Sequence, residues 1–298
     1  MSAPLMMVLA TLLFAAMGVC VKFASQHYAT GEIVFYRGLV GAIAMALLLR
    51  SRGIAMSTRL PAMHFWRSAS GVTALSLWFY AIGGLPLATA MTLNYMSSVW
   101  MALFLIGGAI VLGGARTDGR LVATVLVGFV GVALILRPTI ERDQLWHGLM
   151  GLLSGLLSAM AYLQVTALGR AGEPEPRVVF YFSLGGMAAG LLISIPFGGF
   201  HVHGDWFAAT MLLAVGLLAT AAQLLMTRAY SIGRPLVNAS LQYLGIVYAF
   251  IFGAVLFDDP IAPMALAGMA LVVGAGLAAV RLRNTVAPRV AAPSTLEP

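Results

Sequence analysis

The chain has 298 residues, of which 61% are hydrophobic and 9% are charged, and its net charge is +7. Soluble domains are usually about half apolar and a quarter charged, so a mean hydropathy of +0.95 argues against a soluble enzyme or binding domain. The basic residues are scattered between apolar runs, which argues against nucleic acid as a partner. The lipid bilayer is therefore the expected surrounding.

Cys20 is the single cysteine and lies in an apolar run. One cysteine excludes an intramolecular disulfide and a multi-cysteine metal site, and no cofactor is expected. The first apolar stretch has no basic residue in positions 1–4 and no clear cleavage site before Lys22. It is therefore expected to be a retained helix and not a signal peptide.

Ten apolar runs follow one another along the chain, separated by short polar or Gly/Pro segments. A helix needs about 20 such residues to cross a hydrocarbon core, so the pattern predicts an all-α integral membrane protein with ten transmembrane helices. The predicted spans cover residues 4–24, 32–50, 64–84, 87–112, 119–137, 147–169, 177–198, 206–230, 235–257 and 262–282.

Arginine is distributed unevenly between the two sets of predicted loops. Thirteen arginines lie on the side of the termini, including four, Arg50, Arg52, Arg59 and Arg67, between the second and third spans. The opposite loops hold only two, at positions 137 and 142. Basic residues are retained on the cytoplasmic side of a membrane, so both termini are expected in the cytoplasm.

Three short stretches recur in the same order in the two halves of the chain: 34–41 with 179–186, 80–87 with 230–236, and 92–96 with 240–244. Such repeats mark internal symmetry, and a unit of five spans forces the second copy into the opposite topology. The sequence predicts two inverted five-helix repeats, residues 1–140 and 145–283, followed by a disordered cytoplasmic tail, 284–298.

Lys22 at the end of the first span, Phe35-Tyr36-Arg37 on the second, and the paired motifs around Pro86 and Pro235 resemble the drug/metabolite transporter superfamily. The similarity covers about residues 3–283 and is greatest to EamA-type exporters of aromatic and other neutral amino acids. It implies a transporter in the plasma (inner) membrane, and not an enzyme. Other metabolites, or cationic drugs moved with a coupling ion, are the alternative substrates.

Two amides are placed symmetrically by the predicted repeat. Asn94 lies about 12 Å below the outer surface and Gln242 about 10 Å above the inner one, at 1.5 Å per residue. An aromatic residue follows each amide, and another follows at a longer spacing. Amides and aromatic rings suit an amphiphilic solute, although both also serve as ordinary helix contacts. The candidates are Asn94, Tyr95, Trp100, Gln242, Tyr243 and Tyr248, with Trp78, Tyr80, Tyr162 and Gln164 as weaker members and Gln223 weaker still.

Lys22 and Arg37 are the basic residues clearly inside predicted spans, towards the outer side. Burial of such charges is costly unless they are paired or wet. They are expected to meet a substrate carboxylate during release, or to snorkel to the interface, and Arg37 could instead pair with Glu32. All ten acids lie outside the spans or at their ends. Because proton-driven carriers often use a carboxylate relay inside the membrane, facilitated uniport is favoured.

Two other classes of protein remain as alternatives. An intramembrane enzyme would need a catalytic cluster, and His201, His203 and Asp205 form the nearest one, a weak metal signal. A channel would need charged rings or a carbonyl filter, and neither pattern is present. The small-residue motifs at 151–155 and 186–190 permit close helix packing and fit packing inside one bundle better than dimerisation, so a monomer is favoured.

Overall fold

The structure is a computed structural model that describes residues 1–111, 119–141, 144–197, 199–201, 204–259 and 262–286. Most of these residues are helical, and no strand occurs among them. The helices are α1 (Ala3–Ala24), α2 (Thr30–Ser51), α3 (Pro61–Gly84), α4 (Leu87–Tyr95), α5 (Ser97–Val111), α6 (Gly119–Glu141), α7 (Leu145–Arg170), α8 (Glu175–Ser194), η1 (Ile195–Phe197), α9 (Trp206–Ile232), α10 (Pro235–Leu241), α11 (Leu244–Leu256) and α12 (Pro263–Val286). The predicted tail lies outside the described residues from position 287 onwards.

Six described segments are long and apolar enough to cross a membrane: α1, α2, α7, α8, α9 and the stretch Val237–Leu256. α3 is equally long, but it carries His64, Arg67 and several hydroxyl side chains. Apolar length together with the absence of strands makes this an all-helical membrane protein.

Proline and glycine set several helix ends. α3 begins at Pro61, α10 at Pro235 and α12 at Pro263, because the fixed proline φ fits the first helical turn and its missing N–H would be unpaired there. α3 ends at Gly84, and Pro86 then precedes α4.

The predicted fourth and ninth spans are each split into two helices, so the expectation of continuous helices over 87–112 and 235–257 is corrected. α4 ends at Tyr95 and α10 at Leu241. Tighter turns occur at both breaks: the Val99 N–H donates to the Met96 carbonyl at 2.9 Å, and the Gly245 N–H donates to the Gln242 carbonyl at 2.8 Å. Short stretches of 3-10 geometry inside a long helix often mark functional hinges.

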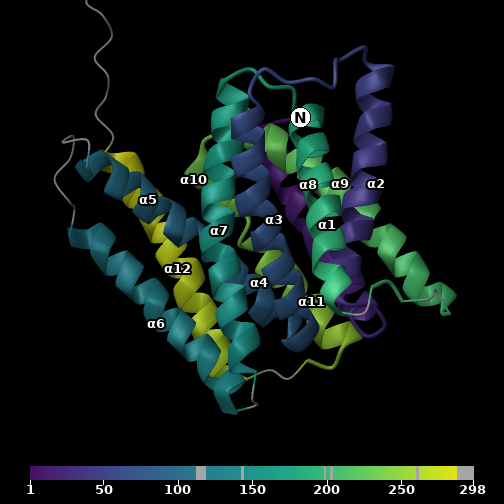
Figure 1. Cartoon of the computed structure of the whole chain (residues 1–298). Coiled ribbons are helices and arrows are strands. Elements are labelled where there is room, and N and C mark those ends of the chain that lie inside the picture. The colour runs from purple at the N-terminus through teal and green to yellow at the C-terminus, as the bar shows by residue number, and fades with distance from the viewer. Residues whose placement is uncertain (112–118, 142–143, 198, 202–203, 260–261, 287–298) are drawn as a thin grey trace, which may run out of the picture.

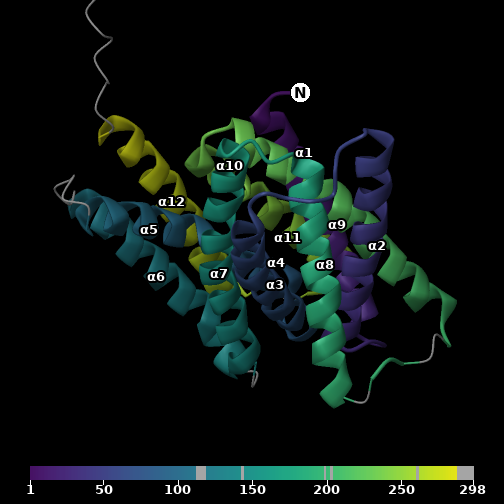
Figure 2. The same ribbon diagram turned by 45° about the horizontal axis from the view of Figure 1, so that its top comes forward.

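The most extensive contacts between helices join α1 with α9, α2 with α8, α3 with α7, and α6 with α12. In Figure 1, α5, α6 and α12 lie on one side of α7, and α1, α2, α8 and α9 lie on the other. Figure 2 shows the same division from a second direction. The N-terminus lies at the end of the bundle that carries the α2–α3 and α7–α8 connections (Figure 1), which we name the amino-terminal end.

Glycines bring several of these helix backbones into direct contact. A Cβ on Gly38 of α2 would lie 2.3 Å from the Met187 nitrogen of α8, and one on Gly190 would lie 2.4 Å from the Phe35 nitrogen. A Cβ on Gly155 would meet the Leu93 carbonyl oxygen at 2.6 Å. The glycines of the small-residue motifs at 151–155 and 186–190 therefore allow helices of one bundle to pack closely. Close approach of this kind gives the van der Waals contact that holds membrane helices together.

Candidate functional site

A small cavity lies among α1, α2, α3, α4, α7, α8 and α9. Its volume is about 40 Å³, room for on the order of three waters at ~10–15 Å³ each and far below the ~300–1,000 Å³ of a typical ligand pocket. A solute therefore enters only if the surrounding helices move apart. The cavity is lined by Phe14, Arg37, Arg67, Gly71, Leu75, Trp78, Asn94, Tyr95, Ser158, Ala161, Tyr162, Phe182, Gln223 and Met226.

Asn94 faces this cavity at the end of α4, immediately before the break in the predicted fourth span. Its side-chain nitrogen donates to the hydroxyl oxygens of Ser154 at 3.0 Å and Ser158 at 3.2 Å, both on α7. Asn94 therefore lines the cavity and also joins two helices, so it fits both of the roles considered for it.

Gln242 lies at the matching break between α10 and α11, where it is 1% exposed. It is absent from the cavity lining, but the Tyr162 hydroxyl lies within hydrogen-bonding reach of Gln242 and of Ser158. Among the described residues, the Oε1 atom of Gln242 has no hydrogen-bond partner. A buried amide oxygen without a partner is costly, so this position holds polar capacity that the present arrangement does not use.

The predicted aromatic residues separate into two groups. Trp78, Tyr95 and Tyr162 line the cavity, and the Tyr162 ring stacks on Tyr230 at 5.2 Å between centroids. Tyr243 is buried at the second break, outside the lining.

Four other predicted residues lie away from the cavity. Trp100 packs edge-on against Phe129 of α6 at 5.1 Å, and Tyr80 stacks on His147 at 4.5 Å. The side-chain oxygen of Gln164 accepts a hydrogen bond from the Ser70 hydroxyl at 2.8 Å. Tyr248 is partly buried on α11. None of the four is part of the lining set.

The two split helices cross each other at their breaks. The Ser98 hydroxyl on α5 donates to the Ala239 carbonyl on α10 at 2.9 Å. A Cβ on Gly245 of α11 would lie 2.6 Å from the Tyr95 hydroxyl oxygen, so that glycine leaves the space that the ring occupies. The matched motifs found in the sequence therefore meet in space next to the cavity.

Arg67 is the main site residue that the sequence reasoning missed. The predicted third span, 64–84, contains Arg67, although the arginine count groups it with the connection before that span; it lies in the second turn of α3 and is 2% exposed. Arg37 on α2 is 3% exposed and lines the same cavity. The guanidinium carbon of Arg67 lies 4.1 Å from the centroid of the Phe182 ring, and that of Arg37 lies 5.0 Å from it. A helix start at Pro61 was the available sequence signal, because it places position 67 inside the helix.

Neither cavity arginine has a carboxylate partner among the described residues. The Nε atoms of both, and one terminal nitrogen of Arg67, are buried without a hydrogen-bond partner. The suggested pairing of Arg37 with Glu32 does not form, since the Glu32 carboxylate accepts from the Ala29 N–H at 2.9 Å and contacts His201 Nδ1 at 2.7 Å. Two buried cations therefore face one small cavity.

Lys22, which is predicted to meet a substrate carboxylate during release, contacts a carboxylate of the chain itself in this structure. Its Nζ lies 2.6 Å from Asp259 Oδ1, and Asp259 Oδ2 accepts the Leu87 N–H at 2.8 Å. The Lys22 ammonium also lies 4.5 Å from the centroid of the Phe257 ring. This pair joins α1, α4 and the segment after α11 at the end of the bundle opposite the N-terminus.

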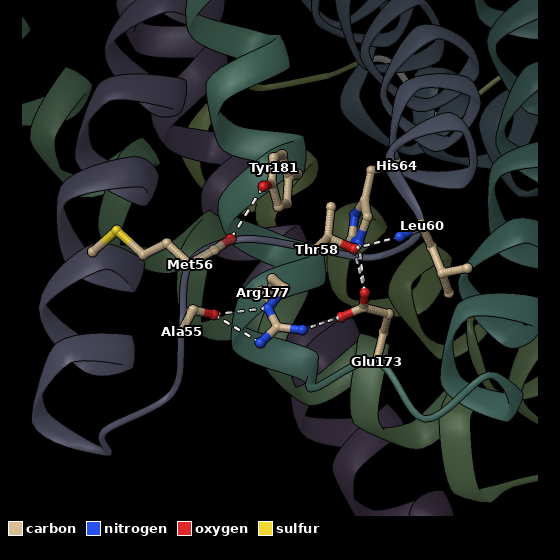
Figure 3. A network of polar contacts seen from close by, with 8 residues as sticks. All are labelled: Ala55, Met56, Thr58, Leu60, His64, Glu173, Arg177 and Tyr181. Atoms are coloured by element: carbon tan, nitrogen blue, oxygen red, sulfur yellow. Dashed lines mark hydrogen bonds and ion pairs between the residues drawn. The ribbon is translucent and has the colours of Figure 1, made fainter.

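A second polar network lies at the amino-terminal end (Figure 3). Arg177 donates to the Glu173 carboxylate at 2.8 Å and to the Ala55 carbonyl at 2.9 Å. The Thr58 hydroxyl donates to Glu173, and the Tyr181 hydroxyl donates to the Met56 carbonyl at 3.1 Å. These contacts tie the α2–α3 connection to the α7–α8 connection. We call them the amino-terminal network.

The charge of Glu173 is stabilised inside this network. Burial alone would raise the pKa of its carboxyl, but hydrogen bonds from Thr58 and Arg177 and the charges of Arg177 and His64 hold that pKa below its ordinary value. Hydrogen bonds and positive charges favour the ionised form. The network therefore depends on an ionised Glu173.

The histidine cluster considered as a metal site does not form one in the described part of the chain. His201 contacts Glu32, Asp205 caps α9 by accepting the Phe207 N–H at 2.9 Å, and position 203 lies outside the described residues. Across the described residues, no group of three His, Cys, Asp or Glu side chains is placed to hold an ion.

Known proteins resemble this chain over nearly its whole length. The Pseudopaline exporter CntI of Pseudomonas aeruginosa (strain UCBPP-PA14) is 31% identical over 285 residues, which cover 95% of this chain and 97% of the exporter. An uncharacterized transporter of Helicobacter pylori (strain J99) is 27% identical, covering 91% and 92%. The riboflavin transporter of Brucella anthropi is 24% identical, covering 91% and 95%.

A solved crystal structure has the same fold. It aligns with a TM-score of 0.68 at 18% identity and covers 96% of this chain and 99% of the other. The EamA-like transporter family model matches residues 1–137. Given an exporter of 31% identity along almost the full length, the chain belongs to the EamA-like transporter family.

Proposed function

We propose that this protein exports amino acids, with aromatic and other neutral ones favoured, or similar small metabolites, by alternating access. The observation that carries the proposal is the cavity beside the crossing of the two split helices, where Asn94, Tyr95, Trp78 and Tyr162 supply amide and aromatic groups. Transporters of several folds bind solutes where discontinuous helices meet near the membrane midplane. Amide and ring together suit a solute that has a polar head and a planar side chain.

The pattern of helix contacts supports two inverted five-helix repeats, residues 1–140 and 145–283. Suppose that α1, α2 and α3 of the first half correspond to α7, α8 and α9 of the second. An exchange of the two halves then replaces α1 by α7 and α9 by α3, so the contact of α1 with α9 becomes the contact of α7 with α3. Both contacts are extensive. The α2–α8 and α6–α12 contacts map onto themselves. The EamA-like match over residues 1–137 coincides with the first of these halves. Ten spans follow if each split helix counts as one.

Two polar closures at opposite ends support alternating access. The amino-terminal network closes one end through Glu173 and Arg177, and Lys22 with Asp259 joins helices at the other. Each closure must open in turn while the other holds, as rocking of two repeats about a fixed site requires.

The proposed location is the inner membrane, with both termini in the cytoplasm. Exposed arginines at positions 50, 52, 59, 170, 228 and 234 gather towards the amino-terminal end, which supports that end as the cytoplasmic one. Removing Arg67 from the loop count still leaves twelve arginines against two.

Facilitated uniport is proposed because no Asp or Glu lines the cavity. An imposed pH gradient tests this directly in proteoliposomes. The solute should equilibrate without accumulating, and uphill flux driven by the gradient would contradict uniport.

Counterflow in proteoliposomes tests the substrate. Vesicles loaded with one unlabelled amino acid should take up the same labelled amino acid faster than empty vesicles, and phenylalanine is the first compound to use. A panel of nucleosides and cationic drugs serves as the comparison. Failure of every amino acid, with success of another class, would overturn the amino-acid assignment.

A second candidate function is export of a different metabolite. The 31% identity to the Pseudopaline exporter CntI favours it, and the riboflavin transporter of Brucella anthropi is more distant. Cationic drugs are less suitable, since Arg37 and Arg67 would repel a cation in the cavity. An intramembrane enzyme has the least support, because the relatives described above with an assigned activity are transporters.

A further inference from the structure

The geometry points to an anion site inside the cavity. We propose that the guanidinium groups of Arg37 and Arg67 together bind an acidic group of the solute, which is the carboxylate in the case of an amino acid, and that an anion consequently binds more tightly than a zwitterion of the same shape. The inference rests on the proposed function, because it takes the central cavity as the place where the solute binds. It goes further by naming the group of the solute that the cavity binds.

The burial of these arginines requires an explanation. Arg37 and Arg67 are 3% and 2% exposed, and both lie well inside helices of a membrane protein, on α2 and α3. A charge in that position is costly unless it is paired or faces a polar space. Both arginines line the cavity, which is mostly apolar and too small to hold more than a few waters. A bound anion would satisfy the unpaired donors.

The buried and partly buried acids among the described residues already have other partners. Asp259 contacts Lys22, Glu32 contacts His201, and Glu173 contacts Arg177. The cavity lining contains neither Asp nor Glu. Within the described part of the chain, the positive charge of the cavity is therefore not neutralised by the protein.

The surroundings of Arg67 hold its guanidinium group in place and leave its donors free. The Phe182 ring attracts the cation at 4.1 Å, but a ring face leaves the guanidinium hydrogen-bond donors available. A Cβ on Gly71 would lie 1.8 Å from one terminal nitrogen of Arg67, so glycine at this position makes room for the group. Phe182 and Gly71 together hold the guanidinium group of Arg67 so that its N–H donors face the cavity.

A planar carboxylate is the group that this arrangement fits best. Arginine binds carboxylates through two parallel N–H···O bonds, and a second arginine adds further donors and charge. An ammonium group on the same solute would find only neutral amide, hydroxyl and ring acceptors, such as Asn94 and Tyr162. The expected order of affinity is anion, then zwitterion, then cation, for solutes of the same shape.

Three compounds with one phenyl ring test this order: phenylpyruvate (net charge −1), phenylalanine (zwitterion) and phenethylamine (+1). Binding to the purified full chain in detergent is measured by isothermal titration calorimetry. Phenylpyruvate should bind at least about tenfold more tightly than phenethylamine, a difference of about 1.4 kcal/mol, since hydrogen bonds between charged groups are stronger than those between neutral ones. Equal or weaker binding of phenylpyruvate, or none at all, overturns the proposal.

Variants assign the preference to the arginines. Arg67→Gln should weaken phenylpyruvate binding about tenfold and leave phenethylamine binding no weaker, and Arg67→Lys should restore part of the loss. Gly71→Ala keeps both charges but displaces the guanidinium group, and it should also weaken phenylpyruvate binding. If Arg67→Gln fails to fold, as judged by gel filtration and circular dichroism, the lysine and alanine variants carry the test.

Arg228→Gln is the matched control, because Arg228 is 57% exposed and contacts Glu175 outside the cavity. It should leave phenylpyruvate affinity unchanged, and an equal loss there would overturn the assignment to the cavity.

The two proposals fail separately. Arginine-dependent binding of phenylpyruvate without counterflow of any amino acid would retain the anion site and reject amino-acid export. Counterflow that is unchanged in Arg67→Gln and Gly71→Ala would retain export and reject the anion site.

Discussion

At the residue scale, Asn94 and Gln242 show how one side chain joins helices and also lies next to the proposed solute site. Asn94 lines the cavity while it donates to two serines of α7. Gln242 is buried near Tyr162 with a free side-chain oxygen. Both positions were predicted from repeated motifs, and their role in transport stays a prediction.

Asn94→Ala and Gln242→Ala should each reduce counterflow of the transported solute by up to about tenfold, because each removes hydrogen-bonding capacity of roughly 1 kcal/mol. Flux is measured in proteoliposomes with matched protein content. Gln26→Ala, which changes an exposed amide, is the control and should transport normally. Normal flux in both site variants would leave these amides with a packing role alone.

Arg67 and Lys22 mark the limit of sequence reasoning at this scale. Arg67 follows the polar connection between α2 and α3, so the pattern of the sequence groups it with that connection. The structure shows that α3 already begins at Pro61. Lys22 has its partner 237 residues away, and no local pattern indicates such a contact. Which side chains face the cavity depends on how each helix is rotated against its neighbours, and weak amphipathic patterns in membrane helices do not specify that rotation.

At the element scale, ten apolar runs are predictable because each reflects local composition and length. The breaks at Met96 and at Gln242–Tyr243 are not, since neither contains proline or glycine. The structure places the two breaks against each other, with Ser98 donating to Ala239. Contact between two distant segments therefore stabilises a local geometry that their own sequences do not require.

Glu173→Gln should weaken the contact between the α2–α3 and α7–α8 connections and so lower the free energy of unfolding by roughly 1.5–3 kcal/mol. This is the usual contribution of hydrogen bonds to a charged group. The lowered pKa of Glu173 means that its stabilisation is present above the ordinary carboxyl pKa, about 4.3, and is lost as the pH falls through the folded-state value. Thermal unfolding in detergent at several pH values measures this effect. The difference between wild type and Glu173→Gln should shrink as the medium becomes acidic. A constant difference would contradict the proposed charge state.

Lys22 and Asp259 should show strong energetic coupling. Lys22→Met and Asp259→Asn are each expected to lower the midpoint of thermal unfolding, while the double variant loses less than the sum of the two, because contacting residues couple by roughly 0.5–3 kcal/mol. The more exposed pair Arg228 and Glu175 is the control, with an expected coupling of roughly 0–1 kcal/mol. Additive losses at Lys22 and Asp259 would show that their contact contributes nothing to stability.

At the scale of the whole molecule, the paired contacts of the helices fit two halves that exchange by a two-fold operation. The cavity draws lining residues from both of the proposed halves, Asn94 from the first and Tyr162 from the second. A relative movement of the halves would therefore change the shape of the cavity, which is the physical requirement of alternating access.

The termini should both lie in the cytoplasm. Fusions of green fluorescent protein to either end are expected to fluoresce, and fusions of alkaline phosphatase are expected to be inactive, since each reporter works in only one compartment. The reason is the excess of basic residues on that side. Active phosphatase at either terminus would reverse the proposed orientation and exchange the roles of the two closures.

The sequence by itself determined that this is a helical membrane protein, because composition and the length of apolar runs decide whether a segment is more stable in lipid. It also carried the family resemblance, through motifs that recur in a fixed order. Only the tertiary structure decided that Arg37 and Arg67 face one cavity, that Lys22 is neutralised by Asp259, and that Trp100 and Tyr80 lie elsewhere. These facts depend on contacts between segments far apart in the chain, and such contacts exist only after the helices have packed.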